Sequence, residues 1–185
     1  HKKNIGVLTD LVLSHTSDEH AWFKNSRKQN TNKYSDWYVW ADGKPDNPPN
    51  NWLSVFGGSA WAWHDQRNQF YLHNFLTSQP DLNFHNKEVQ QQMLDEVEYW
   101  LKFGVDGFRF DVINFLFHDS ALRNNPKKNP KLVRPLGFNK DNPYGLQIHK
   151  YDNTQPETLE YLSRVRKVLD KYLSLIHISE PTRQP

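Results

Sequence analysis

Three charged side chains stand where two extended apolar segments of the sequence end. Asp10 lies near the end of the first segment, and Arg109 and Asp111 close the second. Side chains alternate in direction along a strand, so Arg109 and Asp111 are expected to point to the same side. A nearby guanidinium keeps a carboxylate ionised, and the ionised form is the one that acts as a nucleophile. The spacing fits a nucleophile held by its arginine, and it equally fits a structural Arg–Asp pair.

The segments that carry these residues are predicted to be strands of a parallel α/β fold. Residues 4–13 and 105–112 are short runs of mostly apolar residues, a pattern typical of strands buried on both faces. Active-site groups collect at the carboxyl ends of such strands. The charged residues therefore stand where the fold would place a site.

Two helices are predicted between and after these strands. The first begins at Asn86 as N-cap and ends at Gly104 as a left-handed C-terminal cap. The second follows a predicted capping box of Thr154 and Glu157 and reaches Leu169. The resulting βαβα order implies parallel strands with right-handed crossovers, which either a barrel or a doubly wound sheet would satisfy.

Residues 15–85 show a residue pattern unlike that of the predicted strands and helices. Prolines, the Gly57-Gly58 pair and many asparagines interrupt short aromatic segments, and no helical period persists. A loop-rich insertion with short strands is predicted. Its tryptophans are expected to form its core rather than to bind sugar: Trp22, Trp37, Trp40, Trp52, Trp61 and Trp63.

Composition narrows the classes of partner. Lys and Arg number 23 against 21 Asp and Glu, which argues against a nucleic-acid partner. No apolar run is long enough to cross a bilayer, so no membrane partner is expected. The chain has no Cys, which excludes disulfides and thiolate metal sites and is consistent with a cytoplasmic location. Aromatic residues make up 14% of the chain and could stack on sugars or fill a core.

Three motifs resemble those of the α-amylase superfamily, glycoside hydrolase family 13. Residues 107–114 (GFRFDVIN) look like its nucleophile strand, and residues 10–15 (DLVLSH) resemble its first signature. Residues 79–83 (QPDLN) match the signature of its oligo-1,6-glucosidase-like branch. The motifs occur in the family's order, and the resemblance covers roughly residues 1–172.

The resemblance implies a partial (β/α)8 TIM barrel running from strand 3 to helix 4. Residues 1–14 would be barrel strand 3, residues 15–85 the insertion domain, and residues 86–172 helix 3, strand 4, a long loop and helix 4. Residues 173–185 continue neither helix nor loop and resemble the translation of a sequencing-adaptor read-through. They are predicted to be a non-native tail.

The resemblance also implies roles by position. Asp111 would attack the anomeric carbon and form a covalent glycosyl-enzyme, while Arg109 would hold it and balance its charge. Asp10 would organise the strand end beside them. The aromatic and polar residues expected to line the sugar pocket are His15, Phe56, Phe75 and Gln79. Alternatively, His15 would cap a loop, and Phe56 and Phe75 would pack the insertion.

Two departures from the family pattern bear on metal and linkage. Ser14 replaces the usual Asn, which serves a structural calcium in many amylases, so no metal and no cofactor are expected. Val112 follows the nucleophile, as in relatives that cut α-1,6 bonds. The later loops look closer to enzymes that favour short α-1,4 substrates, so we expect a broad exo-glucosidase with α-1,6 tolerance, acting on small oligosaccharides.

The family's acid/base Glu follows a later strand and has no counterpart here, since Glu157 and Glu160 fall in a predicted helix. The chain, which opens on His1, is expected to be an internal fragment that is inactive alone. Sucrose isomerases and trehalose-forming transglucosidases share the same motifs. Two alternative hypotheses lie outside the enzymes: a non-catalytic relative of the amino-acid-transporter heavy chains, and a carbohydrate-binding module.

Overall fold

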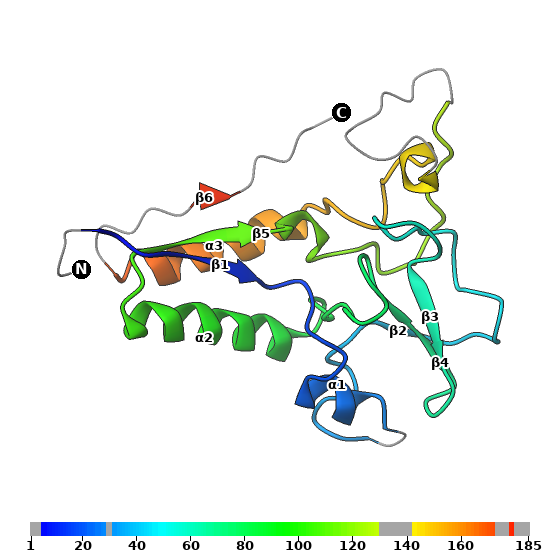
Figure 1. The fold of residues 1–185 in the computed structure, drawn as a ribbon, viewed down its shortest axis with the longest axis horizontal. Helices are drawn as coiled ribbons and strands as arrows, with labels where there is room; N and C mark the ends of the chain where they lie inside the picture. The colour runs from blue at the N-terminus through cyan, green and yellow to red at the C-terminus, as the bar shows by residue number, and fades with distance from the viewer. Residues whose placement is uncertain (1–4, 29–30, 130–141, 173–177, 180–185) are drawn as a thin grey trace.

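A computed structural model describes residues 5–28, 31–129, 142–172 and 178–179 of the protein. Two parallel strands, β1 (Leu8–Val12) and β5 (Gly107–Asp111), lie beside two helices, α2 (Lys87–Phe103) and α3 (Glu157–Leu169). Figure 1 shows both strands running toward a separate, loop-rich region. The carboxyl ends of the strands, where the charged residues lie, therefore face that region.

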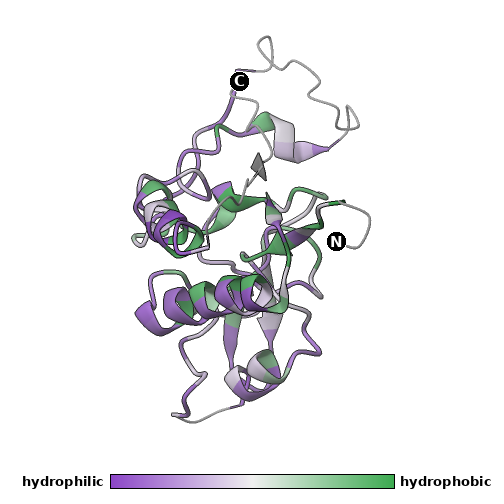
Figure 2. Ribbon diagram, turned by 90° about the vertical axis from the view of Figure 1, so that its left-hand side faces the viewer, coloured by the Kyte–Doolittle hydropathy of each residue, from purple (hydrophilic) through white to green (hydrophobic). Residues whose placement is uncertain are grey.

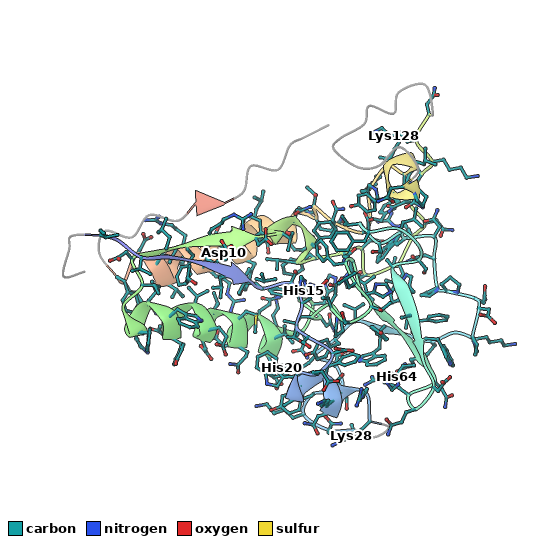
Figure 3. The ribbon with its side chains drawn as sticks, in the orientation of Figure 1. Asp10, His15, His20, Lys28, His64 and Lys128 are labelled. Carbon is teal, nitrogen blue, oxygen red and sulfur yellow. The ribbon has the colours of Figure 1, made fainter. Side chains whose placement is uncertain are left out.

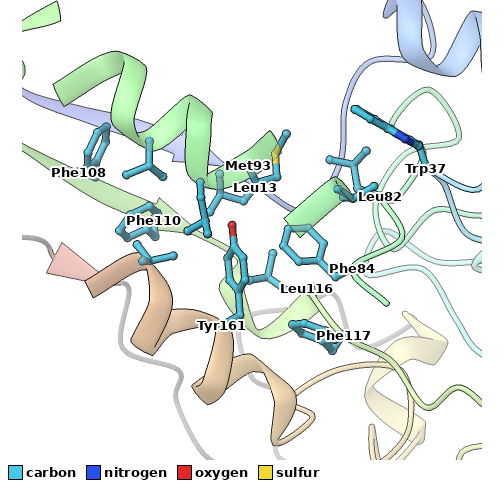
Figure 4. Close-up of a cluster of buried hydrophobic side chains, with 14 of the residues drawn as sticks. Leu13, Trp37, Leu82, Phe84, Met93, Phe108, Phe110, Leu116, Phe117 and Tyr161 are labelled. Atoms are coloured by element: carbon cyan, nitrogen blue, oxygen red, sulfur yellow. The ribbon is translucent and has the colours of Figure 1, made fainter. Parts of the chain in front are cut away.

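The two helices cover one face of the strand pair. Phe108 and Phe110 of β5 are almost fully buried and share one core cluster with residues of α2 and α3, including Val97 and Tyr161. Figure 4 shows these rings beside the helix side chains, and Figure 2 shows that the helices combine hydrophilic and hydrophobic residues. Hydrophobic burial on one face fixes which side chains point away from it.

The prediction that the first strand is buried on both faces is wrong for the described residues. Leu8 and Val12 are 52% and 40% exposed. They lie on the face of the sheet opposite to α2 and α3, and no described element covers that face. The exposed face is the one that carries Asp10.

Helix α2 begins and ends as its sequence predicts. The side chain of Asn86 accepts a hydrogen bond from the Glu88 backbone N–H at 2.8 Å. Gly104 adopts a left-handed conformation with φ 105°, where a residue without Cβ is least strained. The predicted N-cap and C-terminal cap are confirmed, and they set where the chain turns back into β5.

The capping box predicted for α3 is wrong. The helix begins after Pro156, which has no side-chain cap. Thr154 has a positive φ of 55°, and its N–H donates to the Asn114 carbonyl at 2.6 Å. Thr154 thus folds the loop back onto the segment after β5 instead of starting a helix. Glu157 and Glu160 do lie in α3, as expected.

The insertion contains one short helix and an antiparallel sheet. Helix α1 (Ala21–Ser26) was not predicted, and His20 caps its first turn. The sheet has the order β2-β4-β3, formed by β2 (Trp40–Ala41), β3 (Trp61–His64) and β4 (Gln69–Leu72). The predicted loop-rich texture with short strands is confirmed.

The tryptophans of the insertion belong to its core, as predicted. Trp37, Trp52 and Trp61 are at most 4% exposed. Trp22, Trp40 and Trp63 are partly buried and pack against the two hydrophobic clusters. All six rings thus contribute to the packing of the insertion.

The third strand of the sheet is β6 (Ile178–Ser179), whose backbone pairs in parallel with Arg109 and Phe110. The rest of residues 173–185 lies outside the described residues, and the non-native origin of this tail stays a prediction. Two short 3-10 helices, η1 (Ile113–Phe115) and η3 (Pro143–Leu146), shape the loop after β5. No helix in the described part of the chain is long and apolar enough to cross a membrane.

Candidate active site

Arg109 lies between two carboxylates at the carboxyl end of the strand pair. Its Nη1 is 3.2 Å from Oδ1 of Asp10, and its Nη2 is 3.2 Å from Oδ1 of Asp111. Figure 3 shows Asp10 on β1, with His15 just beyond the strand end. The predicted pairing of Arg109 with Asp111 is confirmed, and Asp10 joins it.

Strand register produces this arrangement. Asp10 is the partner of Arg109 and Val12 is the partner of Asp111 in the parallel ladder. Alternation along β5 sends Phe108 and Phe110 into the core and the two charged residues to the opposite face. The charged side chains keep contact with solvent, at 38% exposure for Arg109 and 32% for Asp111.

Asp106, just before β5, has a structural role. Its carboxylate accepts the Val7 backbone N–H at 2.6 Å, and its own N–H donates to the Val7 carbonyl at 2.8 Å. These two bonds extend the pairing of the strands below the ladder. They help to hold the register that brings Asp10 to Arg109.

Val112 ends the strand directly after Asp111. Its backbone is left-handed, with φ 46° and ψ 37°, a conformation that is a clear outlier for a β-branched residue. Such strain costs about 1–3 kcal/mol and persists only where the surroundings enforce it. The turn at Val112 leaves Asp111 as the last residue of β5, at the mouth of the site.

His15 forms the second part of the site together with residues from the insertion. Its Nδ1 is 2.8 Å from Oγ of Ser14, and its Nε2 is 3.1 Å from Nε2 of Gln79. The backbones of His15 and Asp81 form an isolated antiparallel bridge, which brings the DLVLSH and QPDLN motifs together. Burial lowers the pKa of His15, and the negative charge of Asp111 opposes that shift.

Phe75 is the centre of an aromatic group around His15. Its ring centroid is 5.2 Å from that of His15, 6.0 Å from Phe56 and 5.1 Å from Phe115. Phe56 is 64% exposed, so it has a free face. The structure brings together His15, Phe56, Phe75 and Gln79, the four residues expected to line the pocket.

A buried carboxyl supports the loop that carries Phe75 and Gln79. Asp81 is 2% exposed, and its Oδ2 accepts hydrogen bonds from the backbone N–H and the side-chain amide of Asn74, at 3.0 and 2.5 Å. Burial raises the pKa of Asp81 well above its usual value. The residues between Asn74 and Asp81 are thus closed into a loop by their ends.

Two residues of the site were missed as site residues in the sequence. Ser14 was noted only as a departure from the family motif, yet its hydroxyl contacts His15. Phe115 contacts Phe75 from η1, immediately beyond the nucleophile strand. Its position four residues after Asp111 was the one available signal.

Asp10 is the other carboxyl at this strand end, and it is paired with the same guanidinium as Asp111. Glu157 and Glu160 line a hollow of about 130 Å³ that includes none of Asp10, Arg109 and Asp111. In the described residues, no group of three or more His, Asp or Glu side chains gathers in a way that could hold a metal ion. The strand ends offer two carboxylates held by one guanidinium, beside a group of rings and polar side chains around His15.

Known proteins match this chain along nearly its whole length. The family description "Alpha amylase, catalytic domain" matches residues 1–184. A protein of Rhizobium meliloti named "Probable alpha-glucosidase" is 54% identical over 97% of this chain and 33% of its own length. An oligo-1,6-glucosidase of Bacillus cereus is 43% identical over 82% of this chain and 26% of its own. The chain thus spans about a third or less of the curated relatives it matches.

Solved structures of related enzymes are similar to this chain in fold. The alpha-glucosyl transfer enzyme XgtA superposes with a TM-score of 0.93 at 56% identity, covering 97% of this chain and 34% of that one. Isomaltulose synthase from Erwinia rhapontici NX5 superposes with a TM-score of 0.80 at 34% identity, over all of this chain and 30% of that one.

A relative from another functional class also matches in sequence. The human amino acid transporter heavy chain is 38% identical over 93% of this chain and 25% of its own length.

Proposed function

Because this chain belongs to the α-amylase family and shares its TIM-barrel-type α/β fold, we propose that it supplies the nucleophile of a retaining α-glucosidase. The observation that carries the proposal is the Arg109 guanidinium, which holds Asp111 at the carboxyl end of β5 beside the His15 pocket. The relatives named as glucosidases support the same substrate class.

The reaction proceeds in two displacements. The Asp111 carboxylate attacks the anomeric carbon of a terminal α-linked glucose, and the bond to the leaving oxygen breaks as that oxygen takes a proton from a carboxylic acid. Water, deprotonated by the same acid's conjugate base, then attacks the anomeric carbon and releases Asp111. Arg109 keeps its contact with the Asp111 carboxylate, which holds this group in place for both steps.

The acid/base carboxyl is proposed to lie outside the described residues of this chain. Retaining glycosidases need two carboxyls about 5–5.5 Å apart. Asp10 is engaged with the same guanidinium as Asp111, and Glu157 and Glu160 line a different hollow. The chain spans about one third of the length of its relatives, and its described residues supply one of the two carboxyls, so we propose that these residues have no turnover by themselves.

Substrates are short oligosaccharides, with tolerance for α-1,6 linkages on the basis of Val112. The pocket around His15, with Phe75 and Gln79, binds the glucose unit whose bond is cut.

The nucleophile is tested in the full-length protein with Asp111→Asn, and Asp106→Asn serves as the matched control. We expect Asp111→Asn to lose turnover of maltose and isomaltose by about 10³-fold or more. Asp106→Asn keeps an acceptor for the Val7 N–H and should stay within about threefold of the parent. A 2-deoxy-2-fluoro glucosyl fluoride should label Asp111, as read by peptide mass spectrometry. Labelling of another side chain would refute the assignment.

A second candidate is transfer of glucose to a sugar hydroxyl in place of water. The similarity to XgtA and to isomaltulose synthase favours it. Product analysis of the full-length protein on maltose and on sucrose separates the two, since transfer yields new disaccharides and hydrolysis yields only monosaccharides. The hypothesis that the protein is a non-catalytic relative of the transporter heavy chains is rejected if turnover that depends on Asp111 is found.

A further inference from the structure

We propose that Ser14 and Gln79 are positioning residues that hold His15 as the neutral imidazole with its proton on Nδ1 and its Nε2 as an acceptor. The inference rests on the proposed function for its catalytic consequence. The tautomer itself follows from hydrogen-bond geometry.

The amide of Gln79 has only one orientation that satisfies its neighbours. Its Oε1 is 3.1 Å from the backbone nitrogen of Leu76, which is a donor and nothing else. Gln79 must therefore place its oxygen there, and its NH₂ group faces Nε2 of His15 at 3.1 Å. The amide nitrogen donates, so Nε2 of His15 has to accept.

An accepting Nε2 carries no proton, which in neutral imidazole leaves the proton on Nδ1. The partner of Nδ1 is the Ser14 hydroxyl oxygen at 2.8 Å, which accepts the Nδ1–H. Ser14 is fully buried, and its carbonyl accepts the Leu82 N–H at 2.9 Å, so its position is fixed by backbone pairing. One partner of His15 thus accepts a hydrogen bond and the other donates one. If the proton moved to Nε2, neither hydrogen bond would keep its donor and acceptor.

Among the described residues, Asp111 at the end of β5 is the charged group that raises the pKa of His15, and the contacts Ser14, Gln79 and Phe75 are uncharged. A second proton on Nε2 would face the Gln79 NH₂ group, donor against donor. Burial lowers the pKa of His15 in the same sense.

The clamp presents an acceptor, His15 Nε2, beside a donor, Gln79 Nε2. These two nitrogens bond to each other at 3.1 Å, so a sugar hydroxyl, which is both donor and acceptor, would replace this bond by donating to His15 and accepting from Gln79. A fluorine at the same carbon accepts only weakly and cannot donate to His15. Discrimination of a hydroxyl from a fluorine is therefore the expected specificity of this pair.

The tautomer is tested in the full-length protein labelled with ¹⁵N-histidine, with the His15 signals assigned by loss in His15→Gln. We expect Nδ1 in the range of a protonated imidazole nitrogen and Nε2 in the range of an unprotonated one. Gln79→Glu replaces the donor by a carboxylate, so Nε2 should gain a proton. The acid limb of the kcat/KM profile should move to higher pH by about one unit or more.

The role of Ser14 is tested with Ser14→Ala, with Ser14→Asn as rescue because its amide oxygen can accept the Nδ1–H. Ser17→Ala, in the exposed loop beyond, is the matched control. We expect Ser14→Ala to raise KM about five- to tenfold with a smaller change in kcat, and to mix the two tautomers in the NMR spectrum. Ser14→Asn should restore the single tautomer. Thermal denaturation checks that each variant is folded.

Two results would overturn the inference. One is a protonated Nε2 in the parent protein near neutral pH. The other is a Ser14→Ala variant whose spectrum and KM match those of Ser17→Ala. Because the spectrum needs no turnover, a parent with the expected tautomer and no α-glucosidase activity would reject the proposed function and leave the clamp standing.

Discussion

The candidate site consists of two halves that are held in different ways. The charged half, formed by Asp10, Arg109 and Asp111, is fixed by the register of two parallel strands and keeps substantial solvent exposure. The pocket half, formed by His15, Phe75 and Gln79, is fixed by hydrogen bonds and ring contacts between a strand end and the insertion. The group proposed to react is placed by regular structure, and the groups proposed to recognise sugar are placed by loops.

This difference has a physical consequence for substitutions. Exposed ion pairs contribute little to stability, so changes in the charged half should alter turnover and leave the fold intact. Rings and buried polar groups contribute to both packing and recognition, so changes in the pocket half should alter both properties. Four substitutions test the contrast.

The largest effect on turnover is expected for Arg109→Leu. Without the guanidinium, Asp10 and Asp111 lose the group that bridges them, and kcat/KM of the full-length protein should fall by about 10²- to 10³-fold. The melting temperature should change little. Arg166→Leu, which breaks an exposed ion pair with Asp170 on α3, is the control and should affect neither quantity. A large loss of stability in Arg109→Leu would erase the contrast between the halves.

Phe75→Ala should affect both properties. Its ring contacts His15, Phe56 and Phe115, and each such pair is worth about 0.5–1.5 kcal/mol, so we expect a loss of about 2 kcal/mol in the free energy of unfolding. KM should rise about tenfold because His15 loses its neighbour. Urea denaturation and steady-state kinetics measure the two. Leu159→Ala, 70% exposed on α3, should leave both unchanged.

Asp81→Asn should change how stability depends on pH. The folded-state pKa of Asp81 is raised, so its protonated form adds stability below the unfolded pKa of about 3.9, and this is lost as pH rises through the folded pKa. Asparagine does not titrate and still accepts from Asn74. Relative to the parent, the variant should gain about 1.4 kcal/mol per pH unit across that window. Denaturation of the parent and the variant at several pH values measures this difference.

The smallest effect is expected outside both halves. Asn86→Ala removes the N-cap of α2 and should lower the free energy of unfolding by about 1 kcal/mol. Turnover should remain at the parent level, because the cap contacts no residue of the site. Equal losses of turnover in Asn86→Ala and Phe75→Ala would show that the pocket effects reflect general destabilisation.

The strand-held half could be predicted from the sequence because local rules determine it. Alternation places Arg109 beside Asp111, and the caps at Asn86 and Gly104 follow from residue type alone. The capping box at Thr154 failed because a contact with Asn114, forty residues earlier, overrides local propensity. The role of Ser14 and the contact of Phe115 with Phe75 likewise depend on where distant segments meet.

The family motifs did group His15, Phe75 and Gln79, but only the structure shows how they touch. The bond between His15 and Gln79 joins residues 64 positions apart. No periodicity in the sequence reports such a distance. The sheet order of the insertion, with β4 between β2 and β3, has the same long-range origin.

The left-handed backbone of Val112 has a consequence for attempts to alter the proposed linkage preference. A substitution there changes two quantities at once, the shape of the wall beside Asp111 and the torsional energy of the peptide that follows it. Asn and Gly tolerate a positive φ, whereas Ile and Thr are β-branched and would be as strained there as Val. The activities of variants at this position should therefore depend on how well each residue tolerates a positive φ as well as on its side-chain size. A variant that relaxes the turn should raise the melting temperature and move the Asp111 carboxylate away from its reactive position.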